Sequence, residues 1–132
     1  MVTGKLVGGS GYAGSMSSES TIFERIIARE IPADIVFEND HIIAITDIAP
    51  QAPLHLLVIP KTPAYRNVGE LAAADPALLA EMVATAAQLA ADRASGEFRL
   101  VFNTGASAGQ TVFHVHAHVL GGTLLKGTLA QH

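Results

Sequence analysis

The segment QTVFHVHAHVL, residues 110–120, carries histidine at every second position, as His114, His116 and His118. These are three of the six histidines in the chain. On a β-strand, residues two apart point to the same side of the sheet. We therefore expect a strand over 111–120 with the histidines on one face and an apolar opposite face made by Phe113, Val115, Ala117 and Val119.

Capping residues and apolar periodicity predict helices before and after the first three strands in the sequence. Thr21 and Glu24 have the spacing of a capping box, and Asp75 is a candidate N-cap followed by proline at the first helical position. The expected helices cover 21–30, ended by Pro32, a short stretch at 67–74, and 76–94, ended by Gly96. The longest has an apolar stripe formed by Leu78, Met82, Ala86 and Leu89.

Runs rich in β-branched residues predict the remaining strands at 34–40, 41–47, 53–60 and 97–103. The first two flank Glu38-Asn39-Asp40 and have the pattern of a hairpin. Short connections between successive strands favour antiparallel pairing. The predicted fold class is α+β, a five-stranded antiparallel sheet with two main helices.

Composition limits the classes of function. The chain has 132 residues, the size of one domain, and 49% hydrophobic residues, enough for a core. With no cysteine, it has no disulfide scaffold, thiolate metal site or cysteine nucleophile. A net charge of −4 argues against non-specific nucleic-acid binding. No apolar run reaches membrane-spanning length, so we expect a cytoplasmic protein without a membrane partner.

The first fifteen residues, MVTGKLVGGSGYAGS, are rich in glycine and serine and lack periodicity. We interpret 1–15 as a disordered, vector-derived leader, with a native flexible tail as the alternative, and 16–132 as a single domain.

Three interpretations of the histidine row compete. A solvated polar face would be expected to mix residue types. A metal site is possible because imidazole binds zinc, but the outer histidines of a strand are ~13 Å apart, so two of them with His55 would be needed. Nucleotidyl or phosphoryl chemistry fits an imidazole nucleophile. The preceding segment NTGASAGQT, 103–111, favours the last, because its small residues can form an anion-binding nest beside the Ser107 and Thr111 hydroxyls.

HVHAHVL, 114–120, resembles the signature of the histidine triad superfamily, and three longer segments resemble its nucleotide-binding (HINT) branch. These are FERIIAREIPADIVFEND at 23–40, DIAPQAPLHLLVIPK at 47–61 and GQTVFHVHAHVLGG at 109–122. The resemblance runs from about Thr21 to Gly122.

The resemblance implies a mechanism. His116 would attack the α-phosphorus of a nucleotide, and water would release the nucleoside monophosphate from the nucleotidyl-histidine. His118 would bind the phosphate and help protonate the leaving group, with His114 and His55 supporting the site. Asp47 would take the ribose hydroxyls. The phosphate or leaving group would contact Asn103, Gly109, Gln110 and Thr111, and the base pocket would be lined by Ile22, Phe23, Ile26, Ile45, Ile48 and Leu57. Neither a metal nor a cofactor is implied.

Simpler roles exist for several of these residues. Asp47 can open the turn before Pro50, His55 can be a core histidine, and the aliphatic residues can be core. Thr111 stands where many relatives have serine, and the chain lacks the tryptophan-containing tail of animal relatives.

The expected activity is hydrolysis of purine nucleoside phosphoramidates, such as adenosine 5′-phosphoramidate. The alternatives are a nucleotide-binding regulatory protein with residual catalysis, a dinucleoside polyphosphate hydrolase, and a metal-binding protein. Relatives are homodimers, which implies contact through the helix 76–94 and the strand 97–103.

Overall fold

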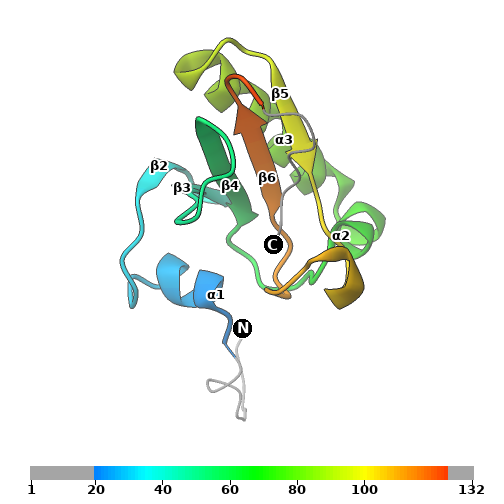
Figure 1. Cartoon of the computed structure of the whole chain (residues 1–132). Coiled ribbons are helices and arrows are strands. Elements are labelled where there is room, and N and C mark those ends of the chain that lie inside the picture. The colour runs from blue at the N-terminus through cyan, green and yellow to red at the C-terminus, as the bar shows by residue number, and fades with distance from the viewer. Residues whose placement is uncertain (1–19, 125–132) are drawn as a thin grey trace.

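The structure, a computed structural model, describes residues 20–124. The predicted leader 1–15, and both ends of the predicted domain, lie outside the described residues. The described chain forms one five-stranded sheet with neighbours in the order β2-β3-β4-β6-β5, all antiparallel (Figure 1). The strands are β2 (Ile35–Glu38), β3 (Ile42–Thr46), β4 (Leu54–Pro60), β5 (Phe98–Val101) and β6 (Ala117–Gly121). The predicted α+β class and antiparallel sheet are confirmed.

The helices are α1 (Ile22–Ile27), α2 (Val68–Ala74) and α3 (Pro76–Arg93), with a 3₁₀ turn, η2, at Ala106–Ala108. The predicted caps are present: Thr21 and Glu24 form a reciprocal capping box, and the Asp75 side chain accepts from the Leu78 N–H. The predicted stripe of α3 is buried. No helix of the described residues is both long and apolar enough to cross a membrane.

The two faces of the sheet have different coverings. On one face, α2 and α3 cover a large core that includes Val58, Met82 and Val119 (Figure 1). On the other, the short α1 packs Phe23 and Ile26 on a smaller cluster of β3 and β4 residues. Strand register places His55, Leu57 and His118 on this second face, because paired residues of antiparallel strands point the same way. The histidine face is therefore the one with the thinner cover.

Helix α1 ends at Ile27, earlier than the predicted end before Pro32. Arg29 has a left-handed backbone (φ 65°), and the Glu30 N–H donates to the Arg25 carbonyl at 2.8 Å. This Schellman arrangement closes the helix one turn early. The Arg29 guanidinium pairs with Glu38 of β2, which also binds Lys61 at 2.7 Å. The helix end is thereby attached to the sheet.

The prediction of one strand over 111–120 was wrong in its first half, because β6 begins only at Ala117. The preceding backbone groups bond outside the sheet: the Val115 N–H donates to the Tyr65 carbonyl at 3.0 Å, and the Gln110 side chain donates to the Val112 carbonyl. Phe113, expected on the apolar face, is 47% exposed. The alternation holds from Val115 onward, where the apolar residues face α3.

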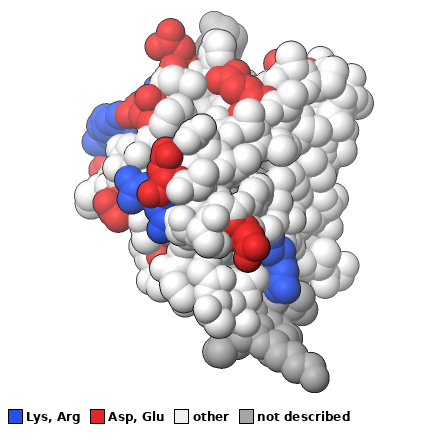
Figure 2. All heavy atoms as spheres, turned by 90° about the horizontal axis from the view of Figure 1, so that it is seen from above, with Lys and Arg blue, Asp and Glu red and all other residues white. Residues whose placement is uncertain are grey.

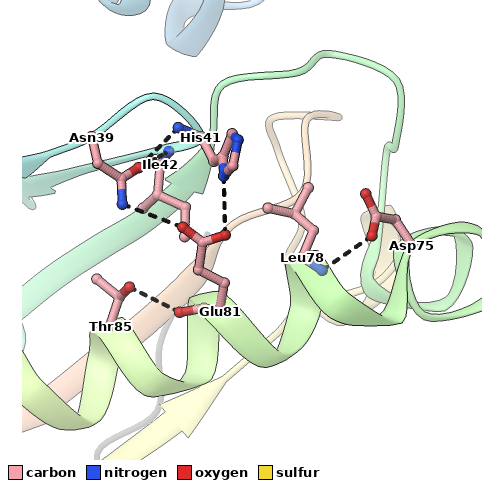
Figure 3. A network of polar contacts seen from close by, with 7 residues as sticks. All are labelled: Asn39, His41, Ile42, Asp75, Leu78, Glu81 and Thr85. Carbon is pink, nitrogen blue, oxygen red and sulfur yellow. Dashed lines mark hydrogen bonds and ion pairs between the residues drawn. The ribbon is translucent and has the colours of Figure 1, made fainter.

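A polar network joins the β2–β3 turn to α3 (Figure 3). The Asn39 side chain accepts from the N–H groups of His41 and Ile42 and donates to Glu81 at 3.2 Å. The His41 ring also contacts Glu81, at 3.2 Å. The network positions the β2–β3 hairpin on α3. Because the His41 side chain is exposed and that of Glu81 partly exposed, we expect the network to add little to the stability of the fold.

Candidate active site

His116 has a ring orientation that suits a nucleophile. Its Nδ1 lies 2.8 Å from the carbonyl oxygen of His114. A carbonyl only accepts, so Nδ1 must carry the hydrogen, and in the neutral ring the lone pair is on Nε2. The ring is buried at 4% exposure and its position is fixed by this bond and by Phe23, whose ring centroid is 4.8 Å away. The backbone thus selects the tautomer with a nucleophilic Nε2.

His55 and His118 form a buried pair with its own fixed tautomers. The backbone N–H of Gln51 donates to His55 Nδ1 at 3.0 Å, which makes Nδ1 an acceptor and puts the hydrogen on Nε2. His55 Nε2 lies 2.9 Å from His118 Nδ1, which therefore accepts. In a neutral His118 the remaining hydrogen is on Nε2. The ring of His118 is 5.3 Å from that of His116, so a proton donor lies beside the nucleophile.

Asp47 lies next to this pair. Its Oδ2 is 3.3 Å from His55 Nε2, and its Oδ1 accepts from the Ala49 N–H at 2.8 Å. The contact with Ala49 stabilises the turn before Pro50, which is the simpler role that the sequence allows for Asp47. The carboxylate is nearly inaccessible, at 2% side-chain exposure.

His114 has a supporting position. Its Nε2 donates to the Pro60 carbonyl at 2.7 Å, and the ring packs edge-on to Phe23. Nδ1 is buried with no hydrogen-bond partner among the described residues. Burial lowers the pKa of His114 below its ordinary 6.5, against the opposing effects of the Pro60 hydrogen bond and Glu24. The ring is a neutral anchor between β4 and the segment before β6.

An apolar pocket of about 200 Å³ adjoins the histidines. Phe23 lines it and also contacts the ring of His116, which places the pocket next to the nucleophile. All of the residues predicted for the base and ribose line it, together with Thr111 and two that the sequence did not indicate, Thr46 and Val112. Ile48 is 97% exposed at its rim. A larger cavity of about 330 Å³ lies between His41, Lys61 and α3, and none of the clustered histidines lines it.

The glycine loop ahead of the histidines is held by Gln110. Its Oε1 accepts from the Gly105 N–H at 2.8 Å, and its Nε2 donates to the carbonyls of Arg66 and Val112. Gln110 was expected to contact the phosphate, but its side chain is 2% exposed and fully engaged. Gly105 and Gly109 have φ of 90° and 97°, a conformation that glycine adopts without strain. Thr111 is exposed, and Asn103 and Gly109 are partly buried.

Three of these side chains have the kinds of atom that can bind a metal ion. Asp47, His55 and His118 each offer one ligand-type atom within 4.8 Å of the others. A ligating imidazole nitrogen needs a lone pair, but the Gln51 N–H directs the hydrogen of His55 to Nε2, the nitrogen facing the other two groups. In this geometry the three residues form a proton-sharing cluster, and a metal ion there would have to displace the hydrogen from His55 Nε2.

Sequence reasoning missed the groups that orient the rings. They are the N–H of Gln51 and the carbonyls of Pro60 and His114. These are backbone atoms, so no side-chain pattern reveals them.

An imidazole with a directed lone pair beside one with a directed N–H is the arrangement of nucleophilic catalysis with acid assistance. Comparison with known proteins agrees. A family model described as "Scavenger mRNA decapping enzyme C-term binding" matches residues 20–129. The chain is 52% identical over 109 residues to an uncharacterized HIT-like protein of Synechococcus elongatus, covering 82% of this chain and 95% of that protein.

It is also 43% identical over 116 residues to the purine nucleoside phosphoramidase of Escherichia coli strain K12, covering 86% of this chain and 97% of that protein. Among solved structures, a HIT family hydrolase from Clostridium thermocellum matches with a TM-score of 0.77 at 40% identity, covering 85% of this chain and 98% of that chain. The chain belongs to the histidine triad (HIT) family, and its relatives place it with the hydrolases of that family.

Proposed function

We propose that the protein hydrolyses purine nucleoside 5′-phosphoramidates through a nucleotidyl-histidine intermediate. The observation that carries the proposal is the pair of preset tautomers, a lone pair on His116 Nε2 beside a proton donor on His118 Nε2. The 43% identity to a purine nucleoside phosphoramidase supports the same substrate class.

In the first step, the His116 Nε2 lone pair forms a bond to the α-phosphorus. The P–N bond breaks, its electron pair leaves on nitrogen, and this nitrogen takes a proton from His118. In the second step, water attacks the phosphorus of the nucleotidyl-histidine and gives a proton to His118, while the P–N bond to His116 breaks. The products are the nucleoside monophosphate and the amine, and both histidines are restored.

The surroundings fit the parts of such a substrate. The pocket lined by Phe23, Ile45 and Leu57 is apolar and adjoins His116, as a purine attached to the reacting phosphate requires. The ribose would lie between pocket and phosphate, next to Asp47 at the pocket's edge. The N–H groups of Ala108, Gly109 and Gln110 donate within the loop, so the exposed hydroxyl of Thr111, which lines the pocket, would bind a phosphate oxygen.

The test is release of AMP from adenosine 5′-phosphoramidate in the presence of a chelator, with wild type and His116→Ala compared. His41→Ala is the matched control, because His41 is an exposed histidine on the β2–β3 turn. We expect turnover by wild type and His41→Ala, with a loss of roughly 10³-fold or more in His116→Ala. No turnover by the wild type, with AMP still bound, would refute the hydrolase and favour a nucleotide-binding role.

We also propose that the protein is a homodimer through α3 and β5. β5 is an edge strand of the described sheet, and Val83 of α3 is 40% exposed. An edge strand and an apolar helix face are surfaces that a second copy can cover. Sedimentation equilibrium should give about twice the chain mass, and Val83→Glu should shift it toward the monomer.

Apart from the nucleotide and a second copy of the chain, the proposal includes no partner. On the face seen in Figure 2, lysine and arginine side chains alternate with acidic ones, and much of the surface is uncharged. A nucleic-acid partner would need a continuous basic surface. The expected cytoplasmic location stays a prediction.

A further inference from the structure

Asp47 is placed to act on the histidines as well as on a ribose. Its carboxylate is nearly inaccessible to solvent, and Oδ2 lies 3.3 Å from the ring nitrogen that His55 directs at His118. One ligand-type atom of each of the three residues lies within 4.8 Å of the others. A buried carboxylate needs a compensating charge or hydrogen bonds, and the two imidazoles beside it can become positive.

The ring nitrogens of His55 and His118 have no position for a further proton unless a carboxylate lies beside them. The Gln51 N–H occupies His55 Nδ1, and the 2.9 Å contact between the rings has room for one hydrogen. The neutral pair therefore holds one hydrogen between the rings and one on His118 Nε2. A further proton on His118 Nδ1 would put two hydrogens between the rings. The two rings would then have to turn both hydrogens toward Asp47, whose Oδ2 lies 3.3 Å from His55 Nε2. A carboxylate can accept both hydrogens and, at the same time, balance the added charge.

We propose that Asp47 is a positioning residue for His118, whose carboxylate holds the His55–His118 pair in a singly protonated cationic state from which His118 protonates the leaving group. This inference rests on the proposed hydrolysis. It assigns Asp47 a role that persists when the substrate has no ribose hydroxyls.

The proton balance of the cycle is then complete. In the cationic state His118 has hydrogens on both ring nitrogens, and its Nδ1–H and the His55 Nε2–H both turn from each other toward the Asp47 carboxylate. Loss of the Nε2 hydrogen to the leaving nitrogen gives a neutral His118 and avoids an imidazolate. In the second step the free Nε2 lone pair takes the proton from water and restores the cation. Without the carboxylate, the cation would be an uncompensated charge in a buried site.

Other groups that can carry a charge lie near the pair, and they can either oppose or favour a positive charge on it. His116 lies 5.3 Å from His118, ring to ring, and a positive charge on either opposes one on the other. On β5, Arg99 pairs in register with Leu120, which pairs with His55, so Arg99 is on the histidine face of the sheet. Glu24 of α1 acts on His114. Among these, Asp47 is the carboxylate in contact with the pair.

The experiment compares Asp47→Asn with wild type on matched substrates. Asparagine keeps the Oδ1 atom that accepts from Ala49 and removes the charge. Asp40→Asn is the control, an exposed aspartate on the β2–β3 turn that does not line the pocket beside the histidines. The substrates are adenosine 5′-phosphoramidate, its 2′,3′-dideoxy analogue, and the 4-nitrophenyl ester of AMP, whose leaving group departs without a proton.

We expect Asp47→Asn to lose roughly 10- to 100-fold in kcat with the phosphoramidate and equally with its dideoxy analogue. The loss with the 4-nitrophenyl ester should be less than about threefold, since acid assistance is not needed there. The alkaline limb of the kcat/KM profile should move to lower pH in the variant. A loss confined to the substrate with ribose hydroxyls, or an equal loss with both leaving groups, would overturn the proposal.

A substrate-free measurement keeps this inference separate from the proposed function. In ¹⁵N-histidine NMR, His55 and His118 should gain one proton as a pair, at a higher pH in wild type than in Asp47→Asn. Identical titrations in the two proteins would overturn the role of Asp47, whatever the substrate. Failure of wild type to cleave the phosphoramidate, with the NMR difference present, would instead refute the substrate class.

Discussion

Replacing His114 by leucine should separate the structural role of its ring from the functional role of its backbone. The ring is 1% exposed and donates to the Pro60 carbonyl at 2.7 Å, while the His114 carbonyl fixes the tautomer of His116. Leucine has a similar volume and no donor. The substitution therefore removes the ring's hydrogen bond and leaves the backbone carbonyl that orients the nucleophile.

The expected loss of stability follows from that single bond. A buried carbonyl that loses its donor costs about 1–3 kcal/mol, and the similar volume keeps any cavity contribution small. His114→Gln is the matched variant, because its terminal amide can donate from nearly the position of Nε2. We expect it to lose less than half as much as His114→Leu.

Urea unfolding of wild type and both variants gives the free energies of unfolding, and AMP release gives kcat. We expect His114→Leu to keep kcat within roughly tenfold of wild type, since the backbone carbonyl that orients His116 is kept. If its kcat fell as far as that of His116→Ala while the protein stayed folded, the assignment of the tautomer to the backbone carbonyl would be wrong.

Further predictions concern acid stability, the pocket, the core and metals. Because burial lowers the pKa of His114, the unfolded chain takes up a proton there first, and the free energy of unfolding should fall as pH drops below about 6.5. Urea unfolding at pH 8 and 5.5 should show this, with a smaller change in His114→Leu. Ile48→Ser should raise KM about two- to tenfold at unchanged stability, since the side chain lines the pocket at 97% exposure; an unchanged KM would exclude it from the base site. Met82→Ala, in the core under α3, should cost about 2–5 kcal/mol with kcat unaltered, measured by urea unfolding and AMP release. Chelator treatment should leave activity unchanged, and a loss that added zinc restores would contradict the proton-sharing assignment of Asp47 and His55.

The fold could be predicted largely from local signals. The capping box at Thr21 and the N-cap at Asp75 depend on residues three positions apart, which a sequence shows directly. The start of β6 could not be predicted this way. It depends on the Val115 N–H finding the Tyr65 carbonyl, a partner fifty residues away that alternation does not reveal. The early end of α1 likewise depends on a left-handed Arg29, a conformation uncommon outside glycine.

The candidate site was partly visible in the sequence. The spacing of His114, His116 and His118 indicated that the three side chains lie on one face and form one site. The resemblance to the family added His55 and the pocket residues. The Gln110 amide also has a structural role, since it binds Gly105, Arg66 and Val112, and its expected contact with the phosphate stays a prediction. The tautomers could not be predicted, because the Gln51 N–H is present in any non-proline residue at that position.

The arrangement of the sheet explains how imidazoles can be both buried and reactive. The core under α3 is the larger of the two apolar clusters, so the opposite face can accept polar rings beneath the short α1. On that face each ring has a backbone or imidazole partner for at least one nitrogen, which offsets part of the cost of burial. Because these partners fix the tautomers before any substrate binds, His116 needs no proton rearrangement to become a nucleophile. The burial that holds the rings in place therefore also sets the chemistry that they can perform.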